Sequence, residues 1–479
     1  MYDLVIKGGT LVDARNNLIA RRDLAIEGGK IARLAPEIAA EEAREAYDAA
    51  GKLVMPGIID TEVHIPVRGG GTTAHRQLAR AGVTTALDFS DFRGMLAELP
   101  IAGAGITVGG IQMLGPYAGE TPSSAALDDQ IQQVLHEGAL GIKVLGGHYP
   151  STPEATALMI ARGNAAGAFV GYHCGTTTAP STLAGLRQAP DLIGHNSLQI
   201  AHINAYLRGA DADIVAENEE ALAILRTIPW VVTESHLFPF NGCSGECADD
   251  VPRDQITRNC LRLRGYTETR DGMRQAFLDG YCHANVRSGE GLTQISGEEG
   301  LRLWEEANTR QGVSFPVNSR ISALMTATAR LTPRGVAFEG DGDFIVDTLT
   351  SDGGRWRNVI LEKGLDLVDF GFMTLRQFVH KASDLPARVL ALPEKGHLGE
   401  GADADVIVAD QGRRQVSLTV ANGAVVQLDG VVVGSGATVL TSQAGVKHLS
   451  ELGLPTRVVD VTQGYLYHKG RADSEQGKR

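Results

Sequence analysis

The sequence has no long hydrophobic run and few aromatic residues. Aromatic side chains make up 5% of its 479 residues, and no apolar stretch approaches the roughly 18 residues of a membrane-spanning helix. The first residues, "MYDLVIKGGTLVD", lack the basic leader and apolar core of an export signal. We therefore expect a cytoplasmic protein without a membrane partner.

Concentrated positive charge is also missing. The net charge is −13, and lysine and arginine are scattered, so we expect no nucleic-acid partner. Cysteine is sparse as well, and five of them spread over a long chain do not form a secreted disulfide framework. Cys243 and Cys247 in "NGCSGEC" could hold a metal ion or form a disulfide. Because the second pair of a typical zinc site is missing, we favour a local role in a loop.

Glycine and alternating apolar patterns are abundant. The chain has 58 glycines and is 43% hydrophobic, which is typical of a globular α/β protein. Near the start, "DLVIKGGTLVD" and "DLAIEGGKIARL" predict short antiparallel strands with tight turns, and "SLTVANGAVVQLDGVVV" repeats the pattern far downstream. We predict that residues 1–56 and 396–441 build one small β-sandwich domain.

The sequence pattern between these two ends is different. Apolar runs such as "AGVTTALDF", "GITVGGIQML" and "GAFVGYHCG" alternate with helical stretches, which predicts parallel strands joined by crossover helices. We predict that residues 57–395 form a (β/α)8 TIM barrel. The segment 238–310 has the pattern of long loops and helices over the barrel mouth, and residues 442–479 form a C-terminal extension.

In such a barrel, functional groups lie at the C-terminal ends of the strands. The residues found there are Glu62 and His64 in "VMPGIIDTEVHI", Lys143, His173, His202 and Asp352. Histidines and carboxylates that converge suit zinc or a similar divalent ion. A lysine ammonium does not bind metal, so spacing alone leaves the role of the lysine open. Each residue could instead be structural, as a strand-end charge, a core histidine or a turn aspartate.

The ordered motifs "DLVIKGGTLVD", "GKLVMPGIID", "GALGIKV", "QIAHIN", "TSDGG" and "GHLGEGADADVIV" resemble the amidohydrolase superfamily, in its hydantoinase, dihydroorotase and D-aminoacylase-like branch. The resemblance implies a centre of two divalent metal ions. Lys143 would react with carbon dioxide to form a carbamate that bridges them. His173 and His202 would bind the second metal, and Asp352 would bind the first and relay protons.

The first motif departs from the family pattern, which has two histidines where this chain has Glu62 and His64. A carboxylate oxygen reaches zinc at about the distance of an imidazole nitrogen. The glutamate adds a negative charge to those of the carbamate and Asp352, and as a hypothesis this shell favours manganese or iron over zinc.

The resemblance implies a metal-dependent hydrolase that cleaves a non-peptide C–N (amide) bond through a metal-bound hydroxide. The small-molecule substrate would be a cyclic amide, imide or ureide, or an N-acyl amino acid. Candidate substrate contacts are His236, His283, Arg287 and Arg355. The alternatives are a mononuclear hydrolase or deaminase, with Glu62 as an acid/base, and an inactive scaffold. A homo-oligomer is the expectation at the level of the family.

Overall fold

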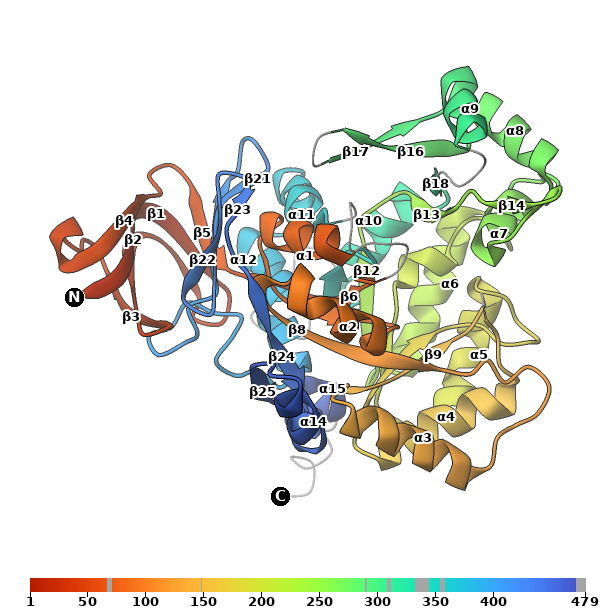
Figure 1. Cartoon of the computed structure of the whole chain (residues 1–479), viewed down its shortest axis with the longest axis horizontal. Coiled ribbons are helices and arrows are strands. Elements are labelled where there is room, and N and C mark those ends of the chain that lie inside the picture. Colours follow the sequence, from red (N-terminus) through yellow and green to blue (C-terminus); the bar gives the residue numbers. More distant parts are fainter. Residues whose placement is uncertain are drawn as a thin grey trace.

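A parallel barrel forms the centre of the protein (Figure 1). The computed structural model describes residues 1–66, 71–147, 149–288, 291–307, 312–331, 344–353 and 358–470. The barrel strands are β6 (Ile58–Val63), β7 (Val83–Asp88), β8 (Ala104–Leu114), β9 (Gly141–Leu145), β10 (Phe169–His173), β11 (Gln199–Ile200), β12 (Val232–His236) and β19 (Thr348–Thr350). Each strand pairs in parallel with the next one in this order. A parallel bridge between Val63 and Gly353 closes the ring, so the predicted TIM barrel is confirmed.

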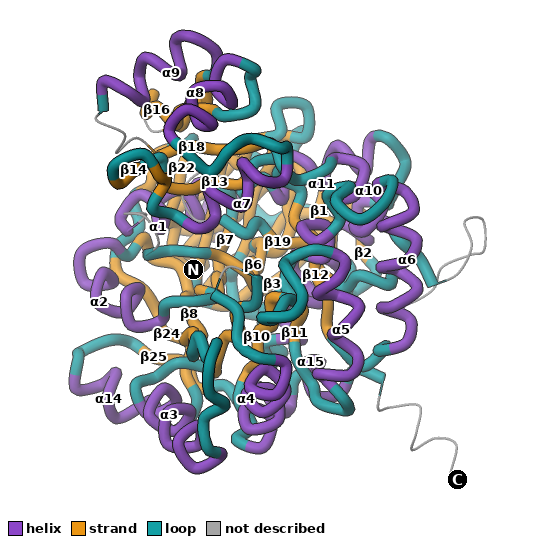
Figure 2. Tube along the Cα trace, turned by 90° about the vertical axis from the view of Figure 1, so that its right-hand side faces the viewer, coloured by secondary structure: helices purple, strands orange, loops and turns teal. Residues whose placement is uncertain are grey.

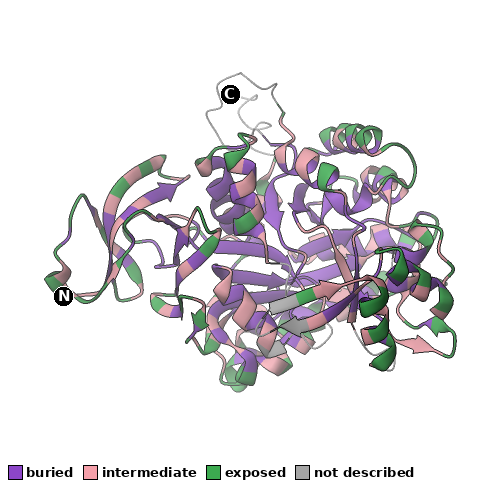
Figure 3. Ribbon diagram, turned by 90° about the horizontal axis from the view of Figure 1, so that it is seen from above, coloured by how far each residue is buried: buried purple, intermediate pink, exposed green. Residues whose placement is uncertain are grey.

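Helices surround the barrel, and Figure 2 shows them as a ring around the central strands. They are α1 (Gly71–Arg80), α2 (Phe92–Ala102), α3 (Ser124–His136), α4 (Pro153–Ala165), α5 (Leu183–Ile193), α6 (Ile214–Thr227), α10 (Arg320–Thr328) and α11 (Ile360–Asp369). Strand residues that share one apolar cluster with these helices include Val108, Ile142 and Val170. Phe169, the neighbour of Val170 on β10, and Val232 on β12 belong to a second cluster. Neighbouring residues of a strand point to opposite faces. Both strand faces are therefore buried, as Figure 3 shows.

The two ends of the chain share a second sheet. Its strands are β1 (Tyr2–Asp13), β2 (Leu18–Glu27), β3 (Lys30–Ala35), β4 (Ala43–Asp48), β5 (Leu53–Pro56), β20 (Val406–Asp410), β21 (Gln415–Ala421), β22 (Ala424–Leu428) and β23 (Val431–Val432). The ends meet where β5 pairs antiparallel with β20. Asn422 and Gly423 both have positive φ in the turn between β21 and β22, as the Asn-Gly signal predicts for a tight hairpin. The predicted β-rich unit is confirmed, as one nine-stranded hydrogen-bonded sheet.

The last part of the chain returns to the barrel. Strand β24 (Gly436–Thr441) pairs in parallel with the first half of β8, and β25 (Thr456–Val458) pairs with β24. The short helices α14 (Val446–Glu451) and α15 (Tyr465–His468) follow. Although β24 lies within the predicted range 396–441, it extends the barrel sheet, and the exact domain boundaries stay a prediction. Between α11 and β20 lie α12 (Leu375–Val379) and α13 (Leu385–Val389). Among the described residues, no helix is long and apolar enough to span a membrane.

An insert between β12 and α10 forms a separate lobe, drawn in green at the upper right of Figure 1. Its elements are β13 (Asn241–Ser244), β14 (Cys247–Ala248), β15 (Val251–Pro252), α7 (Gln255–Leu263), α8 (Arg270–Leu278), β16 (His283–Ser288), β17 (Gly291–Ile295), α9 (Gly297–Glu306) and β18 (Gly312–Phe315). Strands β13, β18, β16 and β17 form an antiparallel sheet, and Phe277 and Trp304 lie in the lobe's own apolar core. The predicted helices are present as α7, α8 and α9, whereas the strands of this lobe were not predicted, because several of them are too short to give a periodic signal.

The cysteines of the insert and Cys174 are reduced. Cys243 is buried in the core of the insert on β13, and Cys247 lies half-buried on β14. No disulfide therefore joins this pair.

Replacing Phe277 by alanine tests the separate core of the insert. Phe277 is fully buried, with its ring centroid 5.5 Å from that of Trp304. Loss of this ring leaves a cavity, so we expect Phe277→Ala to lower the free energy of unfolding by about 3–5 kcal/mol, measured by urea denaturation with tryptophan fluorescence. As a control, Phe370→Ala removes a ring that is 76% exposed and should cost less than about 0.5 kcal/mol. Equal losses in both variants would contradict a packed insert.

Candidate metal centre

The residues predicted from strand ends lie at the C-terminal end of the barrel. Glu62 is the penultimate residue of β6, Lys143 lies in the middle of β9, and His173 ends β10. His202 and Asp352 each follow a short strand by two residues, after β11 and β19. The parallel barrel therefore brings side chains from five strands to one end.

Three of these side chains form one cluster. Among the described residues, Glu62, His202 and Asp352 form a group whose possible ligand atoms all lie within 4.8 Å of one another. His202 Nε2 is 3.7 Å from Glu62 Oε1, and Lys143 Nζ is 3.8 Å from the same oxygen. The cluster therefore contains a carboxylate, an imidazole and a second carboxylate, with a lysine beside them.

Two further histidines border this cluster. His64 Nε2 is 3.2 Å from Asp352 Oδ1, and its Nδ1 is 3.1 Å from Ser90 Oγ. The ring of His173 meets the ring of His202 edge-on at a centroid distance of 4.5 Å, and its Nε2 is hydrogen-bonded to Ser181 Oγ at 2.5 Å.

Burial changes the proton affinity of the central groups. Glu62 and Lys143 are at most 1% exposed. Burial, and next the neighbouring Glu234 carboxylate, raises the pKa of Glu62 well above its ordinary value. Burial also lowers the pKa of Lys143, against the pull of Glu62, and lowers that of His202 well below the ordinary value. These shifts favour an uncharged lysine and a neutral imidazole with a free lone pair.

The donor set fits a divalent cation. Both Oε atoms of Glu62 are buried beside the Glu234 carboxyl, and no amide, hydroxyl or ammonium donor of the described residues lies within hydrogen-bond distance of them. Nδ1 of His202 is also buried without a hydrogen-bond partner among these residues. A buried carboxylate without a hydrogen bond is costly, and a cation would compensate it. Carboxylate oxygen together with imidazole nitrogen is a ligand set for zinc, manganese or iron.

Two buried carboxylates that support the cluster were not predicted. Glu234 on β12 accepts hydrogen bonds from the His202 amide at 3.1 Å and from Gln199 Nε2 at 2.6 Å. Asp60 accepts one from the Ser351 amide at 3.2 Å and lies 2.5 Å from Ser351 Oγ. Burial raises the pKa of each to about 7. Glu234 and His236 are two positions apart on β12, so their side chains point to the same face of the strand. This spacing could have indicated Glu234 from the sequence.

The residues predicted to contact substrate are spread out. His236 ends β12, and its Nε2 is 3.9 Å from Asp352 Oδ2. His283 begins β16 in the insert, where its ring meets that of Phe240 at a centroid distance of 5.2 Å. Arg287 is described only through its backbone in β16, and Arg355 lies outside the described residues.

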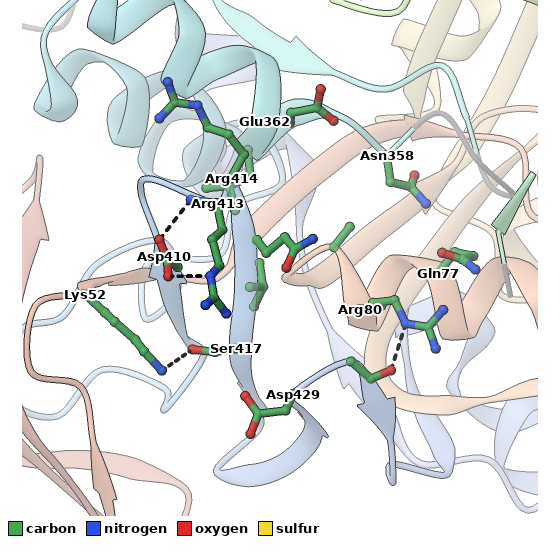
Figure 4. A pocket seen from close by; sticks show the side chains of 15 residues that line it. Lys52, Gln77, Arg80, Asn358, Glu362, Asp410, Arg413, Arg414, Ser417 and Asp429 are labelled. Carbon is green, nitrogen blue, oxygen red and sulfur yellow. Dashed lines mark hydrogen bonds and ion pairs between the residues drawn. The ribbon is translucent and has the colours of Figure 1, made fainter.

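A cavity of about 720 Å³ lies elsewhere, between the nine-stranded sheet and helices α1 and α11 (Figure 4). None of the predicted site residues lines it. Arg414 at its wall pairs with Asp366 and Asp369, and Lys52 donates to Ser417 Oγ at 3.1 Å. Arg414 therefore joins the sheet to α11, whereas the bond between Lys52 and Ser417 lies within the sheet.

Comparisons with known proteins agree with this barrel. No family model matches the chain. A curated N-acyl-D-glutamate deacylase of Alcaligenes xylosoxydans xylosoxydans is 24% identical over 441 residues, which cover 85% of this chain and 87% of that protein.

Two solved structures share the fold. An N-acyl-D-glutamate deacylase from Bordetella bronchiseptica, complexed with zinc and a phosphonate inhibitor, matches with a TM-score of 0.61 and 18% identity. The match covers 91% of this chain and 99% of that chain. A dihydropyrimidinase from Brevibacillus agri matches with a TM-score of 0.58 and 18% identity, and covers 92% of this chain and 98% of that one.

The buried Asp60 carboxyl gives a pH-dependent prediction. An exposed aspartate ionises near 3.8, whereas the folded protein holds the pKa of Asp60 at about 7. Between these values the folded state binds more protons than the unfolded state, so this group lowers stability as pH rises. We expect chelator-treated Asp60→Asn to gain stability relative to the wild type from about pH 4 to about pH 7, and no more above it. Urea denaturation at several pH values measures the difference, and a constant difference would contradict the raised pKa.

Proposed function

Because the chain belongs to the deacylase and hydantoinase branch of the amidohydrolase superfamily, we propose that it is a metal-dependent hydrolase of a non-peptide C–N bond. The substrate is an N-acyl amino acid or a cyclic amide, imide or ureide. The observation that carries this proposal is the convergence of Glu62, His202 and Asp352 within 4.8 Å at the barrel mouth. The deacylase and dihydropyrimidinase relatives disfavour the deaminase and scaffold alternatives.

The metal-holding residues are the ones that converge on this end of the barrel. They are Glu62, His64, Lys143, His173, His202 and Asp352. These residues would hold two divalent ions, which would supply Lewis-acid polarisation of the amide carbonyl and of water. Glu62 replaces a histidine of the family pattern, and its full burial beside His202 and Lys143 supports a role as a ligand rather than as a surface charge. The oxygen-rich donor set favours manganese or iron beside zinc.

Lys143 contributes as a carbamate. Only the uncharged amine attacks carbon dioxide, and burial lowers the pKa of Lys143 in this direction. The new bond joins Nζ to the carbon of carbon dioxide, and one proton leaves the nitrogen. The carbamate would supply anionic oxygens to the metal centre, which the unmodified lysine could not do. This explains a lysine in a position where an ammonium could not bind metal.

Asp352 moves the proton. Its carboxylate lies between two imidazoles, 3.2 Å from His64 Nε2 and 3.9 Å from His236 Nε2. It accepts the proton of the attacking water as a general base and delivers it to the leaving nitrogen as a general acid. The side chain is 13% exposed, so a substrate can reach it from the barrel mouth. We assign contacts to the rest of the substrate to His236, His283, Arg287 and Arg355.

Elemental analysis and a hydrolysis screen test the proposed function. We expect at least about one divalent ion per purified chain, and hydrolysis of an N-acyl amino acid or a cyclic ureide when zinc or manganese is added separately. A chelator should abolish the activity, and the metal should restore it. Glu62→Gln, with a weaker ligand in the same place, should hold less metal than the wild type. A wild-type protein that retains no metal and hydrolyses none of these substrates would refute the function.

The carbamate has its own test. We expect Lys143→Ala to lower kcat by about 100-fold or more, because the bridging anion is lost, and acetate or propionate to restore part of the rate. Lys395 offers a matched control, since it is also fully buried but pairs with Asp405 at 2.5 Å. Lys395→Ala should lower stability and should not respond to added carboxylic acid. Unchanged activity in Lys143→Ala would eliminate the bridge.

A further inference from the structure

His202 has an unusual backbone conformation. Its φ is 30° and its ψ is 66°, in the left-handed region that a non-glycine residue adopts only at an energetic cost. The strand before it, β11, pairs with its neighbours only through Gln199 and Ile200. The strand ladder therefore ends before His202, and another interaction has to hold the strained residue.

That interaction is a hydrogen bond to a carboxylate inside the barrel. Glu234 Oε1 accepts the His202 amide hydrogen at 3.1 Å, and its Oε2 accepts Nε2 of Gln199 at 2.6 Å. The same Gln199 Nε2 also lies 3.3 Å from Thr61 Oγ1 on β6. All of these side chains except that of His202 are fully buried. One carboxylate thus connects β12 to the strained turn, to β11 and, through Gln199, to β6.

We propose that Glu234 is a positioning residue that holds His202 in its left-handed conformation and thereby aims its imidazole at the metal centre. The proposal rests on the proposed function, because the imidazole is useful as a metal ligand. Glu234 acts through its acceptor geometry and not as a ligand. It is not part of the described cluster of Glu62, His202 and Asp352. The hydrogen bond from the His202 amide to Glu234 Oε1 is buried, and a hydrogen bond shielded from water offsets part of the strain.

The other strained member of the cluster is supported in the same way. Asp352 has a φ of 48°. The preceding Ser351 is held through both its amide and its hydroxyl by the buried carboxylate of Asp60. Gly353 then donates its amide to Ser351 Oγ at 3.2 Å. In both places a buried acid below the site fixes a backbone turn that presents a candidate ligand.

Two substitutions separate geometry from charge. Glu234→Gln removes the charge but keeps an oxygen at the same reach for the His202 amide. Gln199 can turn its own Oε1, which has no hydrogen-bond partner among the described residues, towards the new amide group. Glu234→Asp keeps the charge but withdraws the acceptor by one methylene group. If Glu234 acts by its geometry, Glu234→Asp should weaken metal binding and Glu234→Gln should retain it.

The first measurement is metal affinity by competition with a chelator, using zinc alone and manganese alone. We expect Glu234→Asp to bind about 10–100-fold more weakly than the wild type and Glu234→Gln to stay within about threefold. With metal at saturation, kcat should fall in the aspartate variant while KM changes little. The matched control is Glu217, a buried glutamate that accepts the Gly209 amide at 2.8 Å. Glu217→Asp should leave metal affinity unchanged.

The second measurement is amide hydrogen exchange at His202 in chelator-treated protein. The amide should exchange at least about tenfold faster in Glu234→Asp than in the wild type or in Glu234→Gln, because only the aspartate loses the bond. Weaker metal binding in Glu234→Gln than in Glu234→Asp, equal loss in both, or no change in either would overturn the proposal. A wild type that binds no divalent ion would refute the proposed function, and hydrogen exchange would then decide the positioning role by itself.

Discussion

The structure is organised around the buried carboxyl group of Glu62, which contacts a second buried carboxyl, that of Glu234. Glu62 has no exposed surface, and no amide, hydroxyl or ammonium donor of the described residues lies within hydrogen-bond distance of its oxygens. Lys143 Nζ lies 3.8 Å from Glu62 Oε1, and burial lowers the pKa of this lysine and so disfavours its positive charge. Such a group is stable only where a strong compensating charge can enter. The surrounding barrel holds this group at the C-terminal ends of its strands, beside His202 and Asp352.

The scaffold is layered from the metal-binding end downwards. Below the cluster, Thr61, Gln199 and Glu234 form a polar layer whose members bond one another. Deeper still, apolar side chains such as Phe169 and Val232 belong to the cluster that forms the barrel core. A polar layer inside a barrel is costly unless its groups hydrogen-bond one another, and in this layer Gln199 Oε1 lacks a partner among the described residues. Here it also fixes the backbone turns above it, so one network provides both internal hydrogen bonding and precise placement of ligands.

The sequence predicted much of this arrangement for definite reasons. Alternating apolar runs indicated the barrel strands, and the shared C-terminal ends of parallel strands then placed Glu62, His202 and Asp352 at one end. Asn422 and Gly423 likewise predicted a hairpin from local conformational preference. These inferences succeeded because each depends on a short stretch of chain. The metal-binding and catalytic roles of the strand-end residues remain predictions.

What sequence alone missed depends on contacts between distant segments. Glu234 lies 172 positions after Glu62, and only barrel closure brings the two carboxylates into contact. The left-handed turn at His202 has no local signal either, because neither glycine nor asparagine stands there. Its conformation follows from a bond to another strand. A candidate ligand can thus be recognised from its place at a strand end, whereas the carboxylate that accepts its backbone amide hydrogen is visible only in three dimensions. In this barrel, the candidate ligands can be found from short stretches of sequence, whereas the residues that hold them in place come from distant strands.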